Sequence, residues 1–125
     1  MIKPPIFLVD ASNGDLLAFG SSDKVEHYVE SIDVENGEYG KAFDSEGRLL
    51  ALEVDRPSVR HKFLGLESVE LTPVRLVEKE AQPSHEADLA SVLRSALARL
   101  DGRKSPAEAT LADLVEEALN TFRVR

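Results

Sequence analysis

The chain has 125 residues, 42% hydrophobic and 30% charged, values typical of a single folded domain. It contains no cysteine, which excludes disulfides, thiolate nucleophiles and cysteine-based metal sites. The net charge is −8, and residues 10–55 alone hold twelve acidic and three basic residues, a net of −9, so the rest of the chain is about neutral. Such a charge repels nucleic acid and anionic membranes and attracts a basic protein, although an acidic surplus also serves solubility alone.

The first ten residues, MIKPPIFLVD, contain one lysine and a short apolar run. The run is too short for a secretory signal or a membrane span, and no later apolar run approaches the required length. We therefore expect a soluble, cytoplasmic protein with no membrane partner.

Two apolar runs, residues 6–9 and 16–19, flank Asn13-Gly14, a dipeptide that strongly favours chain reversal. They predict a β-hairpin that begins after Pro4 and Pro5, because proline cannot donate to a strand ladder.

One short helix is expected after this hairpin, capped by Ser22. Its apolar residues follow the helical spacing i, i+3, i+4 and i+7, and they are Val25, Tyr28, Val29 and Ile32. Glu26 and Glu30 are expected on the opposite, solvent-facing side.

Residues 38–43 and 48–54 predict a second hairpin around the turn Asp44-Ser45-Glu46-Gly47. Asp44 can accept a backbone N–H in such a turn, and Gly47 can adopt the left-handed conformation that a bulged loop needs. Both faces of residues 49–52 are apolar, which indicates a central place in the sheet. Strand alternation predicts that Tyr39 and Phe43 share one face.

Two further strands are indicated in residues 58–77. Val59, His61 and Phe63 alternate to one side of the first. Pro73 interrupts the second run, which predicts either an edge strand or a strand split in two.

The C-terminal third repeats one apolar pattern at offsets 0, 3, 4, 7, 8 and 11. The two sets are Leu89, Val92, Leu93, Ala96, Leu97 and Leu100, and Leu111, Leu114, Val115, Ala118, Leu119 and Phe122. They predict an antiparallel helical hairpin over residues 84–123. The first helix ends at Asp101-Gly102, and the second begins either with a capping box at Ser105–Glu108 or one turn later at Thr110 and Asp113.

Together these elements predict one α+β domain over residues 1–125. A mostly antiparallel sheet of about four to six strands and one short helix occupy residues 1–78, and the helical hairpin follows. The two apolar stripes are buried either on one face of the sheet or on a second copy of the chain.

We find no pattern that points to catalysis, a cofactor or a metal. The glycine-rich phosphate loops and the nucleophile elbow are missing, and the three histidines lack ligand spacing. A helix-turn-helix interpretation would use Arg94, Arg99, Arg103, Lys104, Arg123 and Arg125 as phosphate contacts. Residues 81–125 nevertheless hold six basic and seven acidic residues, whereas DNA readers present a basic face. We therefore expect neither an enzyme nor a nucleic-acid-binding protein.

The hairpin of residues 38–54 offers a hypothesis for a partner-binding site. Acidic residues gather near its ends and Tyr39 provides an aromatic anchor, so the candidate residues are Asp33, Glu35, Glu38, Tyr39, Asp44 and Glu46. The competing interpretation is that Tyr39 belongs to the core and the acids only solvate loops.

The segments KPPIFLVD, DKVEHYVE and SIDVENGEYGKAFDSEGRLL resemble small bacterial proteins, some of which look like immunity proteins of toxin–immunity systems. The resemblance covers about the first 55 residues. It implies a small binder that neutralises a cognate toxin, and the acidic charge suits a basic toxin. The alternative hypothesis is a structural or regulatory homodimer assembled through the C-terminal helical hairpin.

Overall fold

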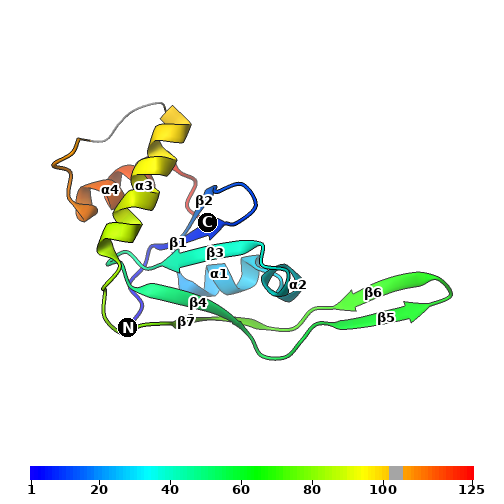
Figure 1. Ribbon diagram of the computed structural model, residues 1–125. Coiled ribbons are helices and arrows are strands. Elements are labelled where there is room, and N and C mark those ends of the chain that lie inside the picture. Colours follow the sequence, from blue (N-terminus) through cyan, green and yellow to red (C-terminus); the bar gives the residue numbers. More distant parts are fainter. Residues whose placement is uncertain (102–105) are drawn as a thin grey trace.

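The computed structural model describes residues 1–101 and 106–125 (Figure 1). Within these ranges the chain forms a mixed α+β fold, as predicted. Its elements are β1 (Ile6–Asp10), β2 (Leu16–Phe19), α1 (Ser22–Tyr28), α2 (Ser31–Glu35), β3 (Tyr39–Phe43), β4 (Leu49–Val54), β5 (Val59–Phe63), β6 (Leu66–Glu70), β7 (Val74–Glu78), α3 (Glu86–Asp101) and α4 (Leu111–Thr121).

Five strands form an antiparallel sheet in the order β2-β1-β3-β4-β7. The predicted hairpin β3–β4 is therefore central, with β3 in the middle of the sheet. Its turn has the predicted chemistry, because Asp44 accepts the backbone N–H of Glu46 at 3.0 Å and Gly47 has a φ of 90°. Pro73 splits its run, so that β6 ends before it and β7 follows as an edge strand.

The helices cover both faces of this sheet: α3 and α4 lie on one face, which is the first of the two expected alternatives, and α1 and α2 lie on the other. On one face Phe7 and Phe43 pack with α3 and α4 through Leu93 and Leu114. On the other face the core includes Val25 of α1, with residues of α2 and β7 beside it. Successive side chains of β1 point alternately into the two cores. The sheet is therefore the middle of three layers.

The apolar stripes of α3 and α4 are thus buried within the same chain. Leu89, Leu93 and Leu97 are almost fully buried, while Leu100 at the end of the stripe stays 57% exposed. Helix α4 begins at the later of the two expected starts, with a reciprocal capping box between Thr110 and Asp113. The other proposed start and the stop at Gly102 fall wholly or partly on residues 102–105, outside the described residues.

A β-bulge corrects the prediction that Tyr39 and Phe43 share a face. The pairing of β1 with β3 shifts register between Leu8 with Ala42 and Asp10 with Tyr39. A shift of one residue moves every following side chain to the opposite face. Phe43 therefore packs in the core under α3 and α4, and Tyr39 packs with the other core.

The single short helix expected after β2 is in fact two. Helix α1 is capped by Ser21, one residue before the expected cap, through a bond from the Lys24 backbone N–H at 3.3 Å. Val29 and Glu30 are extended, and a second helix then begins at Ser31. The break lets Val29 stay in the core while α2 turns toward the connection to β3.

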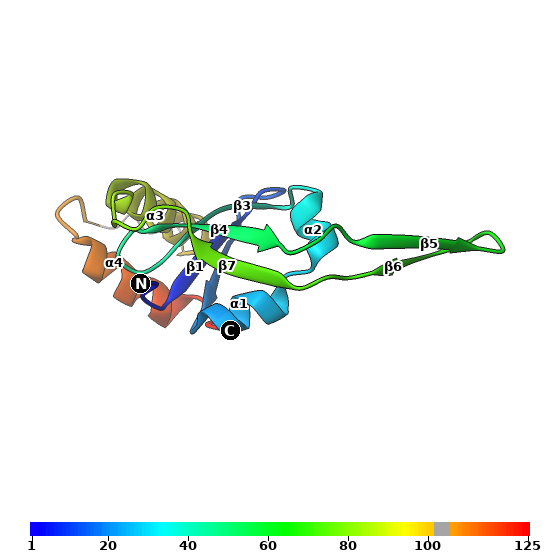
Figure 2. The same ribbon diagram turned by 90° about the horizontal axis from the view of Figure 1, so that it is seen from below.

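Strands β5 and β6 form a separate two-stranded ribbon, the arm, which projects from the three-layered body (Figures 1 and 2). All five residues of β5 are exposed, as are four of the five in β6. The arm therefore contributes little to the core of the described chain.

Candidate interaction surface

The tip of the arm presents three large apolar side chains to solvent. Phe63, Leu64 and Leu66 are 74%, 86% and 76% exposed. Phe63 and Leu66 are cross-strand partners on one face of the ribbon. Single exposed leucines are common on protein surfaces, but a cluster at the end of a projecting hairpin is typical of a contact surface.

The turn at this tip is built from two residues with left-handed backbone, Leu64 with φ of 50° and Gly65 with φ of 78°. Both positions of a type I′ hairpin turn require positive φ, which is why Asn-Gly is the favoured pair. A leucine there carries backbone strain, since its Cβ crowds the chain in this region. Such strain at an exposed apolar residue favours a role in contact over a role in folding.

The base of the arm is held firmly to the body by hydrogen bonds to α2. Glu35 accepts the backbone N–H of Ser58 at 2.6 Å, and the Ser58 hydroxyl lies 2.6 Å from that of Ser31. Ser31 is fully buried and also accepts the Thr72 backbone N–H at 3.0 Å. These bonds fix where the arm leaves the body, which lowers the entropy cost of presenting it to a partner.

Each edge strand of the body sheet is bonded in part to another element of the chain. At β7, Glu26 of α1 accepts the backbone N–H of Leu76 at 2.7 Å. At β2, residue Ala18 forms a parallel bridge with Val124 and accepts the Arg125 backbone N–H at 2.9 Å. Both strands of the two-stranded arm are edge strands, and an uncovered strand edge is a site for pairing with another chain.

The six acidic and aromatic residues predicted as a site lie in two separate groups. Asp33, Glu35, Glu38 and Tyr39 lie on α2 and at the start of β3, whereas Asp44 and Glu46 lie in the turn at its other end. Glu35 is engaged with Ser58 at the base of the arm. The structure therefore does not bring all six together.

Asp44 organises its turn from a fully buried position. Its carboxylate accepts the backbone N–H groups of Lys3, Glu46 and Arg48 at 2.9–3.1 Å and the Arg48 guanidinium at 2.8 Å. Burial alone raises the pKa of Asp44, but these hydrogen bonds outweigh it and lower the pKa below its ordinary value. Glu46 is half-exposed and forms an ion pair with Arg48 at 2.9 Å.

The other group forms an acidic cluster around Tyr39. The neighbouring Asp33 carboxylate raises the pKa of Glu38, with smaller contributions from burial and from Asp10 and Glu30. Burial, followed by the neighbouring Asp33, Tyr28, Glu38 and Asp10, raises the pKa of Tyr39 to about 12. Carboxylates held this close repel one another, and a basic partner would relieve the repulsion.

This cluster borders a cleft between β3 and β4. In the described chain the two strands pair only at Ala42 with Leu50 and Phe43 with Leu49, after which the bulged β3 diverges from β4. The cleft has a volume of about 330 Å³, near the lower limit of ligand pockets. Its lining combines apolar residues of α2, β3 and β4 with two lysines, and includes Val34, Tyr39, Leu52, Lys41 and Lys79.

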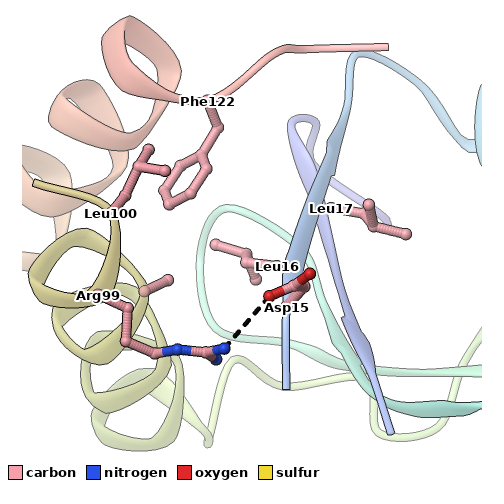
Figure 3. Close-up of a pocket in the computed structure, with 7 residues that line it drawn as sticks. Asp15, Leu16, Leu17, Arg99, Leu100 and Phe122 are labelled. Atoms are coloured by element: carbon pink, nitrogen blue, oxygen red, sulfur yellow. Dashed lines mark hydrogen bonds and ion pairs between the residues drawn. The ribbon is translucent and has the colours of Figure 1, made fainter. Parts of the chain in front are cut away.

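A second cavity of about 320 Å³ lies between β2, the end of α3 and the C-terminal segment (Figure 3). Leu16, Leu100 and Phe122 give it an apolar wall, and Asp15 forms an ion pair with Arg99 at 3.3 Å on its rim. Arg99 also donates to the carbonyls of Asn13 and Gly14. The guanidinium therefore fastens the β1–β2 loop to α3.

Two other arginines of the C-terminal region also contact residues of their own chain. Arg94 donates to the carbonyl oxygens of Pro106 at 2.9 Å and Ala109 at 3.2 Å. Arg125 lies over the Tyr28 ring at 4.8 Å. Arg103 and Lys104, named in the helix-turn-helix interpretation, lie outside the described residues.

One histidine lies between two carboxylates at the start of α3. His85 contacts Asp88 through Nδ1 at 2.8 Å and Glu80 through Nε2 at 3.2 Å. These hydrogen bonds, that to Asp88 first, raise the pKa of His85. Its backbone N–H also donates to the Gly47 carbonyl at 2.9 Å, so the group joins α3 to the β3–β4 turn.

The strands of the arm were predicted from the sequence, but its tip was not predicted as a candidate surface. The available signal was an apolar run interrupted only by a turn glycine, Phe63-Leu64-Gly65-Leu66. Strand alternation places Phe63 on a face but does not show whether that face is covered.

Within residues 1–101 and 106–125, no helix is long and apolar enough to cross a membrane. Comparison of the chain with protein-family models, with curated proteins and with solved structures gave no match.

Proposed function

We propose that this protein is a non-enzymatic binding module that acts in the cytoplasm and engages another protein through the β5–β6 arm. The observation that carries this proposal is the exposed cluster Phe63, Leu64 and Leu66 at the arm's tip. Burying these side chains on a partner would remove a large apolar area from water. Hydrogen bonds at the base hold the arm in one orientation, so less conformational entropy is lost when a partner binds.

The specific form that we propose is neutralisation of a basic bacterial toxin, as the resemblance of the first 55 residues implies. Support comes from the acidic cluster of Glu30, Asp33 and Glu38 near the base of the arm. Opposite charge on a partner would speed encounter and fix orientation, while the apolar tip would supply affinity.

The homodimer through α3 and α4 has less support. It was motivated by two apolar stripes in need of cover, and these stripes pack against the sheet of their own chain.

The proposal is tested by affinity capture from a bacterial lysate with the wild-type chain and a tip variant, Phe63→Thr/Leu66→Thr, as baits. Threonine keeps β-propensity at these exposed positions, so the fold should be retained. We expect a protein that binds the wild type and is lost with the tip variant; a basic toxin would in addition be lost as salt rises. Identical capture by both baits would overturn the role of the arm.

A further inference from the structure

The cleft between β3 and β4 is lined by two cations and by apolar side chains. Lys41 and Lys79 belong to its lining, and no carboxylate of the described residues does. The apolar part includes Val34 of α2 and Leu52 of β4. Ligand pockets combine hydrophobic walls with a few placed polar groups, and here the polar side chains at the cleft are positively charged. The lining therefore suits an anion with an apolar body.

Neither lysine is neutralised by an ion pair within the part of the chain that the structure describes. Lys41 lowers the pKa of Asp88, and Lys79 lowers that of Glu80, but both carboxylates are hydrogen-bonded to His85. Neither carboxylate lines the cleft. The two ammonium groups are thus available to attract an anion, although the chain as a whole is acidic.

The backbone of the two strands also leaves polar groups at the cleft. The last hydrogen-bonded pair of β3 and β4 is Ala42 with Leu50. Such pairs recur at every second residue of an antiparallel ladder, so the next one would join Gly40 and Leu52. The described strands do not form that pair, and both residues line the cleft. Backbone groups that lie outside a ladder need other partners, which favours a ligand with a polar group.

We propose that this cleft binds a small organic anion with an apolar body, such as a medium-chain carboxylate. Lys41 and Lys79 hold the charged group, and the apolar body packs against Val34, Tyr39 and Leu52. A volume of about 330 Å³ admits a molecule of this size. A cation would be repelled by the lysines, and a neutral molecule would leave both of them unpaired. The inference does not rest on the arm, whose residues do not line the cleft.

Titration calorimetry of the full chain with octanoate, octanol and octylammonium tests this inference, because the three probes share one alkyl chain and differ in charge. We expect octanoate to bind and octanol to bind about tenfold or more weakly, since hydrogen bonds to charged groups are stronger than neutral ones. Octanoate should shift the backbone amide signals of Gly40 and Leu52 in NMR spectra. Octylammonium should leave these signals unchanged.

Variants of the lining separate the charge from the apolar contact. Lys41→Gln/Lys79→Gln should weaken octanoate binding about tenfold or more and leave octanol binding unchanged. Lys24→Gln/Lys62→Gln is the matched control, because it removes the same charge at exposed positions outside the cleft. Ala51→Phe enlarges a side chain of the lining and should weaken binding of both probes.

Octanoate that binds no tighter than octanol, or equally to both double lysine variants, would overturn the inference. Amide shifts confined to the other cavity, at Leu16, Leu100 and Phe122, would also overturn it. The tip variant Phe63→Thr/Leu66→Thr should bind octanoate as the wild type does. Failure of the arm to capture a protein would therefore reject the proposed function and leave this site standing, and the reverse result would reject this site alone.

Discussion

The Glu26 carboxylate on α1 accepts a 2.7 Å hydrogen bond from the backbone N–H of Leu76 on edge strand β7. A charged side chain thus satisfies a donor that would otherwise lie open at the sheet edge. The sequence placed Glu26 on the solvent side of its helix, because helical spacing alone assigns it opposite Val25 and Val29.

We predict that Glu26→Ala lowers the free energy of unfolding by about 1–3 kcal/mol, the usual value for a hydrogen bond to a charged group. The amide of Leu76 should also exchange its hydrogen faster. Denaturant unfolding and hydrogen exchange would measure these effects. Glu30→Ala is the matched control, because Glu30 is exposed and caps α2 without a side-chain bond; equal effects of the two variants would refute the edge-capping role.

Gly47 is predicted to be far less tolerant of substitution than Gly37. Both have positive φ, 90° and 71°, but an added Cβ at Gly47 would lie 2.7 Å from the Cα of Glu86, whereas that at Gly37 meets open space. Gly37→Ala should cost about 1 kcal/mol of backbone strain. Gly47→Ala should cost several-fold more, because it also displaces the start of α3. Thermal unfolding of the two variants measures the difference.

Removal of the buried Asp44 carboxylate is expected to destabilise the fold by about 3 kcal/mol, because Asp44→Ala leaves three backbone donors and a guanidinium without this acceptor. Since the folded pKa is lowered, this stability is present above the ordinary aspartate pKa and is lost as pH falls through the folded value. Unfolding measured from neutral to acidic pH should show the gap to wild type closing. Glu46→Ala, which removes only a half-exposed partner of Arg48, should cost under about 1 kcal/mol.

His85 should make the docking of α3 dependent on pH. Its pKa is raised in the folded state, so its contribution is complete below the ordinary value of 6.5 and is lost as pH rises through the folded pKa. Stability of the wild type relative to His85→Gln should therefore be highest under mildly acidic conditions and decline toward alkaline pH. Glu80→Gln/Asp88→Asn should abolish this dependence with His85 still present; its persistence would assign the effect to another group.

Local signals were sufficient to predict much of the fold. The Asn13-Gly14 reversal, the Asp44–Gly47 turn and the repeated stripes of α3 and α4 each depend on residues close in the sequence. The side of the sheet on which Tyr39 lies could not be predicted, because the bulge near Gly40 arises from the pairing of β3 with β1. The break between α1 and α2 also depends on tertiary packing, since Val29 must reach the core.

The candidate site was harder to predict, because it also depends on how distant parts of the chain pack together. Acidic residues near one another in sequence were grouped together, but β3 separates Asp33 and Glu38 from Asp44 and Glu46. The sequence predicts Asp44 as a surface turn residue, but it is fully buried and bonded to Lys3 and Arg48. Exposure of the arm's tip depends on which strands join the body sheet.

Leu64 offers a variant that separates binding from folding. Leu64→Asn replaces a leucine at φ of 50° by the residue that type I′ turns favour before glycine. We expect unfolding stability to be unchanged or higher by up to about 1 kcal/mol, and partner binding to be weaker because an 86% exposed apolar side chain is lost. A loss of stability together with unaltered binding would show that Leu64 serves the fold.

The central claim, that the arm is the contact element, is tested most directly by comparing the wild-type and Leu64→Asn/Phe63→Thr/Leu66→Thr chains as baits. Quantitative mass spectrometry would identify and quantify the captured proteins, including untagged copies of this chain. The account predicts at least one protein, another chain or its own, held by the wild type and absent from the variant. The same proteins in the same amounts on both baits would contradict it.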